Sequence, residues 1–189
     1  MKRFGLLITI GIIVLILVVL GMSLAGAYNS LVRQSQEIEG QWAQVQTQYQ
    51  RRFDLIPNLV SSVKGFMAQE KAIFDAIAEA RTRYGQATSP DSQAAAASEL
   101  ETAVGRLLVI MENYPQLKSD TLVVQLMDEL AGTENRISVE RRRYNELVRD
   151  YNTSVKSFPT NIIAGMFGFH EHTYFESVSG ADLVPKVEF

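Results

Sequence analysis

The sequence predicts an all-α fold in which one N-terminal transmembrane helix precedes an antiparallel helical bundle of three to four helices. Two observations lead to this prediction. No charged residue occurs between Arg3 and Arg33, and the remainder of the 189 residues repeats apolar side chains at steps of three or four. We therefore expect a transmembrane anchor with a short N-terminal tail over residues 1–27, a helical-bundle domain over 28–169 and an extended C-terminal tail over 170–189.

The anchor is an uncharged, mostly aliphatic run over residues 4–27. As a helix that rises ~1.5 Å per residue, it reaches ~36 Å and crosses a ~30 Å hydrocarbon layer with some tilt. A cleaved signal peptide is the alternative, because Lys2 and Arg3 form a basic start and Ala25-Gly-Ala27 resembles a cleavage site. The run exceeds the ~7 to 15 apolar residues of a typical signal peptide. We therefore expect an uncleaved single-pass anchor in the lipid bilayer.

Basic residues flank the anchor unequally, since Lys2 and Arg3 precede it and only Arg33 follows closely. The positive-inside rule then predicts a cytoplasmic N-terminus and a bundle on the periplasmic or outer side of the bacterial inner membrane. Because this difference is only two basic residues against one, a bundle on the cytoplasmic side is kept as the alternative. Within the anchor, Gly21 and Ala25 are small residues four positions apart, a spacing typical of close helix crossings. This spacing hints at self-association.

Three helical segments are expected after the anchor. The first covers residues 28–84, where one proline and few glycines interrupt the apolar repeat. The second begins with Ser89 as N-cap and Pro90 as first helical residue, and ends near residues 113–115. The third begins at residues 119–120 and ends before Pro159.

Pro57 leaves two architectures open, because an interior proline costs ~3 kcal/mol unless the helix kinks or ends. A reversal at residues 54–57 would give an up-down-up-down four-helix bundle. A kinked continuation would let the two later helices pack as a hairpin along the distal half of one long helix. The apolar stepping of Phe53, Ile56 and Val60 crosses the proline without a change of phase. We therefore expect continuity, with a shorter C-terminal helical element completing the bundle.

A continuous first helix of ~57 residues would be too long for the later helices to cover. The part nearest the anchor would be covered least, and its apolar residues are Leu31, Ile38, Trp42 and Val45. Exposed apolar stripes are usually buried by association. The sequence thus predicts a homo-oligomer held by this stripe and by the anchors.

Composition excludes several classes of function. The whole chain has 18 Lys and Arg residues against 21 Asp and Glu, and without Lys2 and Arg3 the 16 basic residues of 28–189 leave a net charge of −5, which opposes nucleic-acid binding. Without cysteine there is no disulfide, no thiolate nucleophile and no Cys-ligated zinc. The sequence also lacks the glycine-rich nucleotide-binding motifs and the nucleophile elbow of serine hydrolases. We therefore expect no cofactor and no catalytic activity.

His170-Glu171-His172 is the only histidine cluster. In an extended chain the two imidazoles point the same way, so one surface metal ion could bind. Two ligands do not make a catalytic zinc site, however, and the zinc-protease spacing is absent. A solvated tail is therefore the preferred interpretation, and a metal-dependent enzyme that uses His170 and His172 is kept as the alternative function.

Other polar and apolar clusters have structural interpretations. Charged residues at 51–54 and 134–136 lie near expected helix interfaces, where an arginine paired with a carboxylate can fix the packing register. No nucleophile or base of recognisable spacing accompanies them. Residues 162–169 form an uncharged run that either caps the bundle core, as we expect, or presents a patch to a partner or bilayer. The stretch 174–189 is expected to be extended.

Short motifs are distributed over nearly the whole chain. They are Tyr28-Asn29 with Leu31-Val32, Ile38-Glu39 with Trp42, the run from Arg52 to Val60, the run from Glu112 to Lys118, the run from Thr133 to Ile137, Tyr144-Asn145, Tyr151-Asn152, and Phe158-Pro159 with Gly168-Phe169. With the N-terminal apolar helix, they resemble the LemA family in content and order.

The resemblance implies a membrane-anchored bacterial protein with an antiparallel helical-bundle domain and no established catalytic activity. Relatives are associated with membrane organisation, including magnetosome formation, and some lie beside a membrane zinc protease in the genome. Family descriptions place the short N-terminus outside the cell, opposite to the charge-based prediction. The functional hypothesis is a scaffold or adaptor of the bacterial envelope that associates with itself and recruits other membrane proteins.

Overall fold

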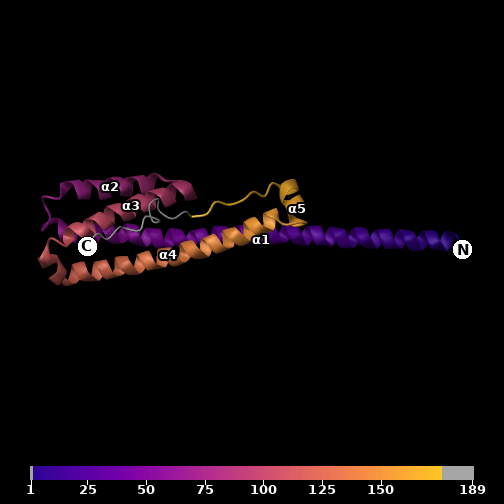
Figure 1. Ribbon diagram of the computed structural model, residues 1–189, viewed down its shortest axis with the longest axis horizontal. Helices are drawn as coiled ribbons and strands as arrows, with labels where there is room; N and C mark the ends of the chain where they lie inside the picture. Colours follow the sequence, from indigo (N-terminus) through magenta and orange to yellow (C-terminus); the bar gives the residue numbers. More distant parts are fainter. Residues whose placement is uncertain (1, 176–189) are drawn as a thin grey trace, which may run out of the picture. The chain divides into compact units, whose positions relative to one another are not determined.

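The computed structural model describes residues 2–175, and their side chains from residue 10 onward (Figure 1). Its elements are the helices α1 (Lys2–Lys64), α2 (Lys71–Gln86), α3 (Pro90–Met111), α4 (Thr121–Lys156) and α5 (Thr160–Phe167), with a short 3-10 helix, η1 (Pro115–Ser119). Over the described residues the chain contains helices and no strand, so the predicted all-α class is confirmed. The predicted extended stretch at 174–189 lies almost entirely outside the described residues.

Contacts divide the described chain into two units. The first unit contains residues 2–40 and 144–174, and the second contains residues 41–143 with Phe175. Both α1 and α4 therefore contribute one end to each unit. α1 passes residue 27 without interruption. The division into an anchor, a bundle and a tail at 27/28 and 169/170 stays a prediction.

The second unit is a bundle built from the end of α1, from α2 and α3, and from the beginning of α4. Its main core takes apolar residues from every one of these helices, for example Ile56, Ile77, Leu107 and Leu126. Leu117 of η1 closes the same core. Short connections make successive helices antiparallel neighbours, and α2 and α3 pack against each other.

The first helix passes Pro57 but ends earlier than the sequence predicts. Continuity across Pro57 is confirmed. Its extension to residue 84 is wrong, because the chain turns between Lys64 and Lys71 and a separate α2 begins. Met67 in this turn donates its N–H to the Val63 carbonyl at 3.1 Å, and its side chain is buried in the core. The apolar stepping therefore continues through the turn, which hid the break.

The expected starts of the later helices are confirmed. The hydroxyl of Ser89 accepts from the N–H of Ser92, whose hydroxyl in turn accepts from the Ser89 N–H, while Pro90 occupies the first helical position of α3. At α4, one carboxylate oxygen of Asp120 accepts from the N–H groups of Leu122 and Val123 at 2.9 and 3.1 Å. These local contacts satisfy donors that a helix start leaves free.

The first unit combines the beginning of α1, the end of α4 and the short α5. Its buried residues come from all three helices: Leu31, Ile38, Tyr144, Val148, Tyr151, Ile163 and Ala164. α5 ends at Gly168, whose φ of 74° is left-handed. This conformation lets the N–H of Phe169 reach the Ala164 carbonyl at 2.9 Å, and glycine adopts it without a Cβ clash.

The expectation of an uncovered stripe next to the anchor is wrong. Leu31, Ile38 and Val45 are fully buried within the chain, and Trp42 is half-buried. The stripe was expected to be bare because the first helix was taken to reach residue 84. Val45 packs with Ala97 of α3 and Ile137 of α4, and Leu31 and Ile38 are buried in the first unit, which also contains the end of α4 and the expected short C-terminal helix, α5.

Candidate functional site

A buried arginine lies where three helices of the second unit meet. Arg52 of α1 is only 1% exposed. Its Nη1 donates to Oε1 of Glu134 on α4 at 2.8 Å, and its Nη2 donates to the carbonyl of Ala97 on α3 at 2.8 Å. Oε2 of Glu101, also on α3, lies 3.6 Å from the same Nη1. One guanidinium therefore connects α1, α3 and α4.

The same carboxylate of Glu101 also faces a second arginine. Nη1 of Arg141 on α4 lies 3.9 Å from Glu101 Oε2, and its Nε donates to the Tyr49 hydroxyl at 2.9 Å. The guanidinium carbons of Arg52 and Arg141 each lie 5.4 Å from the centre of the Tyr49 ring. We call Tyr49, Arg52, Glu101, Glu134 and Arg141 the arginine network. Its two positive and two negative charges balance.

The charges and protonation states of the arginine network favour a role in holding helices together. Burial raises the pKa of Tyr49 above its usual value, and the adjacent Arg141 lowers it only in part. The phenol therefore stays neutral and accepts the Arg141 hydrogen bond. A guanidinium removed from water needs such partners, and here they come from different helices. The predicted arginine–carboxylate pair at a helix interface is thus confirmed for Arg52 and Glu134.

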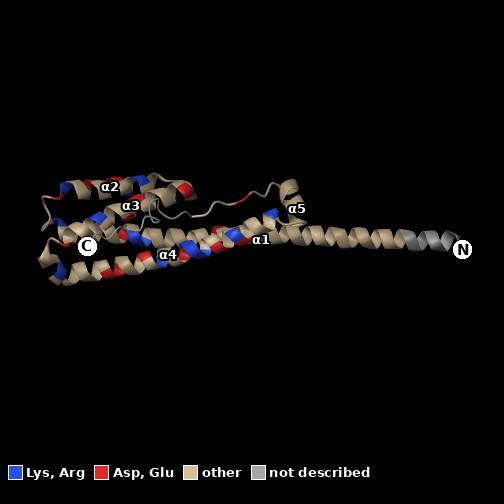
Figure 2. Ribbon diagram, in the orientation of Figure 1, with Lys and Arg blue, Asp and Glu red and all other residues tan. Residues whose placement is uncertain are grey.

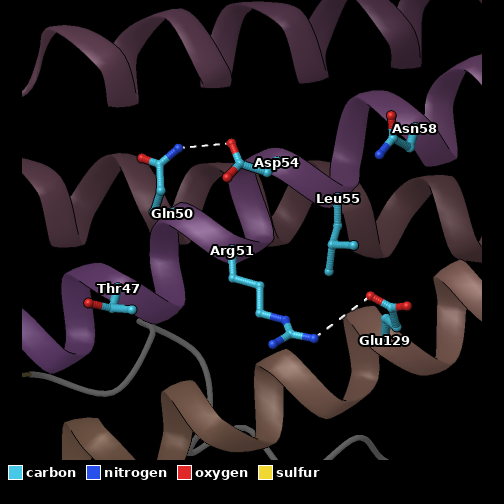
Figure 3. A pocket seen from close by; sticks show the side chains of 7 residues that line it. All are labelled: Thr47, Gln50, Arg51, Asp54, Leu55, Asn58 and Glu129. Atoms are coloured by element: carbon cyan, nitrogen blue, oxygen red, sulfur yellow. Dashed lines mark hydrogen bonds and ion pairs between the residues drawn. The ribbon is translucent and has the colours of Figure 1, made fainter.

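An open polar groove runs between α1 and α4 of the second unit (Figure 3). Its volume is about 550 Å³, and its lining residues are Thr47, Gln50, Arg51, Asp54, Leu55, Asn58 and Glu129. A guanidinium nitrogen of Arg51 lies 3.8 Å from Oε2 of Glu129 across the groove, and both side chains are about half exposed. Gln50 donates to Asp54 at 2.8 Å. Exposed pairs of this kind contribute little to stability, so a partner could replace them at small cost.

The two histidines of the predicted pair have different surroundings. Asn152 of α4 is buried and holds the backbone of His172 from both sides, because its Nδ2 donates to the His172 carbonyl and its Oδ1 accepts from the His172 N–H, each at 2.9 Å. The His172 ring lies edge-on to Tyr151 at 5.0 Å, whereas His170 is exposed. Among residues 2–175 no group of three or more His, Cys, Asp or Glu is placed to hold a metal ion.

The segment around these histidines is attached to α4 at two positions. Besides the two Asn152 bonds, Nζ of Lys156 lies 2.7 Å from Oε2 of Glu171. His172 is therefore partly buried and held to α4, which the interpretation as a solvated tail did not predict, whereas His170 and Glu171 are exposed, as that interpretation expects. Sequence reasoning missed the role of Asn152, because an asparagine that binds backbone atoms 20 residues away leaves no pattern in side-chain types.

The anchor part of α1 is exposed along its described length. One helix of the described chain is long and apolar enough to cross a membrane. Residues 10–32 of this helix carry no charge, and Figure 2 draws the part of α1 that follows its grey start without blue or red. Gly21 and Ala25 are exposed there, and the space next to Gly21 is open. Their predicted contact with another copy stays a prediction.

Trp42 lies in the second unit, and its side chain is half-buried. Its ring meets Tyr49 edge-on at 6.3 Å and lies 5.5 Å from the ring of Phe175. Val45, by contrast, belongs to a buried cluster with Ala97 and Ile137. Both residues thus contribute to packing inside the chain.

Comparison with known proteins places these features in a family. The model described as LemA family matches residues 41–189. Magnetosome protein MamQ 2 and Magnetosome protein MamQ 1 of Paramagnetospirillum magneticum are each 26% identical over 181 residues, which cover 82% of this chain and 66% of each relative. Protein LemA of Metamycoplasma hominis is 24% identical over 153 residues, covering 80% of this chain and 70% of that protein. The chain thus spans just under two thirds of the two MamQ proteins.

Proposed function

Because the chain belongs to the LemA family, we propose that it is a membrane-anchored helical scaffold that recruits or assembles other proteins of the bacterial envelope. The observation that carries the proposal is the composition of α1. This one helix contains both the apolar stretch suited to a membrane and residues of the bundle core, such as Ile56 and Val63. A chain built this way attaches a helical bundle to a bilayer without a separate linker.

The relatives support a role in assembly over a chemical one. Three of them carry the name of a magnetosome protein, which associates them with a cellular structure. The hydrogen bonds of the arginine network join α1 to α3 and α4. Its residues therefore stabilise the bundle, and the exposed surface is left for recognition.

The polar groove is the surface that we assign to recruitment. It offers both charges and two amide side chains, from Gln50 and Asn58, in an open depression. The Arg51–Glu129 pair that crosses it is long at 3.8 Å and exposed. A polar protein segment can therefore displace this pair and form two new charged contacts in its place.

Self-association and orientation are part of the same proposal. With Leu31, Ile38 and Val45 buried inside the chain, self-association would use the exposed anchor, where Gly21 and Ala25 permit close approach. The unequal basic flanks of the anchor favour a bundle outside the inner membrane.

The test is photo-crosslinking of the full chain in intact membranes. A photoreactive amino acid at Asn58 in the groove should yield an adduct with another protein, and the adduct should disappear when Arg51 and Glu129 are both changed to Ala. The same probe at Ala78, an exposed residue of α2, serves as the control. The same adducts from both positions, or none from Asn58, would contradict recruitment through the groove.

A further inference from the structure

The short helix α5 has an apolar face that packing inside the chain leaves unused. Its residues Ile163 and Ala164 are buried, but Ile162, Met166 and Phe167 are largely exposed. Phe158, which precedes the helix, is 81% exposed. Ile162 and Met166 lie four residues apart on one face of α5, and we call them, with Phe158 before the helix and Phe167 at its end, the stripe.

The stripe lies in a segment free of charge. Between Lys156 and His170 the chain carries no ionisable side chain, and the polar residues there are few and small. Four large apolar side chains exposed together are unfavourable in water, since covering apolar surface lowers the free energy. Such a surface calls for an apolar medium or partner.

The location of α5 in the first unit identifies that medium. Tyr28 directly follows the mostly aliphatic stretch at residues 4–27 and precedes Arg33, the next charged residue, by five positions. Its ring lies 4.8 Å from that of Phe167 and 5.7 Å from that of Phe169. The end of α5 therefore lies at the level of α1 where the apolar stretch ends. Aromatic residues at this level are typical of the boundary between lipid chains and head groups.

We propose that α5 is a second membrane contact. Phe158, Ile162, Met166 and Phe167 enter the boundary layer of the bilayer that α1 spans, while Ile163 and Ala164 hold the helix on the protein. Interfacial helices lie with their apolar face ~5 to 10 Å inside this layer, which suits side chains of this size. The inference rests on the membrane attachment in the proposed function and is independent of recruitment through the groove.

The test uses full-length protein in liposomes and the absence of cysteine from the chain. Single cysteines at Ile162 and at Met166 are labelled with an environment-sensitive fluorophore, and lipids brominated either near the head group or near the chain end serve as quenchers. Both positions are exposed, so the substitutions spare the core. We expect blue-shifted emission at both, with quenching about twofold stronger by the shallow than by the deep bromine.

Two controls make every outcome decisive. Val109→Cys places the label at an exposed apolar residue of α3 in the second unit and should be quenched by neither lipid. Leu17→Cys in the apolar stretch should be quenched best by the deep bromine. Quenching at Leu17 without quenching at Ile162 and Met166 would overturn the α5 proposal alone, and blue-shifted but unquenched labels there would mean that a protein covers the stripe. No quenching at Leu17 would overturn the membrane attachment as well.

Discussion

The two units of the molecule treat polar and apolar groups in opposite ways. The second unit buries a charged guanidinium, Arg52, among three helices and exposes mostly polar side chains around its groove. The first unit exposes Phe158, Ile162 and Met166 and continues into an exposed aliphatic helix. The difference agrees with the proposal that the first unit contacts lipid while the second contacts water. A surface facing water is polar, whereas a surface facing lipid can remain apolar.

The units also differ in how their polar contacts connect the chain. In the second unit the Arg52–Glu134 bond joins residues 82 positions apart, so it connects helices that are distant in sequence. In the first unit Asn152 reaches only 20 positions, to the backbone of His172. We call the two hydrogen bonds between Asn152 and the His172 backbone the asparagine clamp. We therefore expect the arginine network to affect the stability of a whole bundle and the asparagine clamp to affect one segment.

Removal of the buried arginine should have the largest effect. Arg52→Ala should lower the free energy of unfolding by about 3 kcal/mol, because it removes two short hydrogen bonds and leaves a cavity where three helices meet. Chemical unfolding of the detergent-solubilised chain, followed by circular dichroism, measures this value.

The neighbouring arginine provides the matched control. The Arg51 side chain is 52% exposed and lies 3.8 Å from Glu129. Arg51→Ala should therefore change the free energy of unfolding by less than about 0.5 kcal/mol. Equal losses in the two variants would show that the arginine network contributes no more than a surface ion pair, and the contrast between the units would fail.

Removal of the asparagine clamp should have a smaller and more local effect. Asn152→Ala leaves the N–H and carbonyl of His172 without their partners, which should cost about 1 to 2 kcal/mol. Hydrogen exchange of the peptide containing residues 170–175 should then become roughly tenfold faster, while the second unit keeps its protection. Asn161→Ala, at an exposed asparagine of α5, should change neither. Unchanged exchange in Asn152→Ala would refute the clamp.

The smallest effect concerns stability at high pH. Burial raises the pKa of Tyr49, so above about pH 10 the folded state keeps a proton that the unfolded state has lost. Stability is therefore fully present below pH 10 and falls as the pH rises further.

Tyr49→Phe should reduce this alkaline decline by up to about 1 kcal/mol per pH unit. It should not abolish the decline, because burial also raises the pKa of Tyr84. Unfolding measured between neutral and strongly alkaline pH gives the two slopes. An identical slope in parent and variant would show that Tyr49 titrates alike in the folded and unfolded states.

Sequence reasoning succeeded where the signal is local or periodic. Ser89-Pro90 and Asp120 mark helix starts through contacts within three residues, and the apolar repeat identifies the helices. An arginine–carboxylate pair was expected between residues 51–54 and 134–136 without naming the partners, and Arg52 with Glu134 is such a pair. The position of the first helix end was missed, because Met67 keeps the apolar phase through the turn.

The remaining features depend on contacts that the local sequence pattern does not record. Whether Leu31 and Ile38 are covered depends on where α1 ends, and so on a turn that the repeat conceals. Asn152 binds the backbone N–H and carbonyl of His172, and because every residue has these groups, the sequence does not indicate which residue it binds. The lipid-facing interpretation of residues 162–169 needed the contact between Tyr28 and Phe167, which only a folded chain provides.

The central claim is that this chain works in an assembly at the membrane, and the mass of the native particle tests it most directly. The full chain is extracted from its own membrane together with the surrounding lipid, and the protein mass of the intact particle is measured. We predict a mass well above the 21.1 kDa of one chain, with further copies or other envelope proteins identified in the same particle. A particle that holds one chain of 21.1 kDa and no other protein would contradict the account.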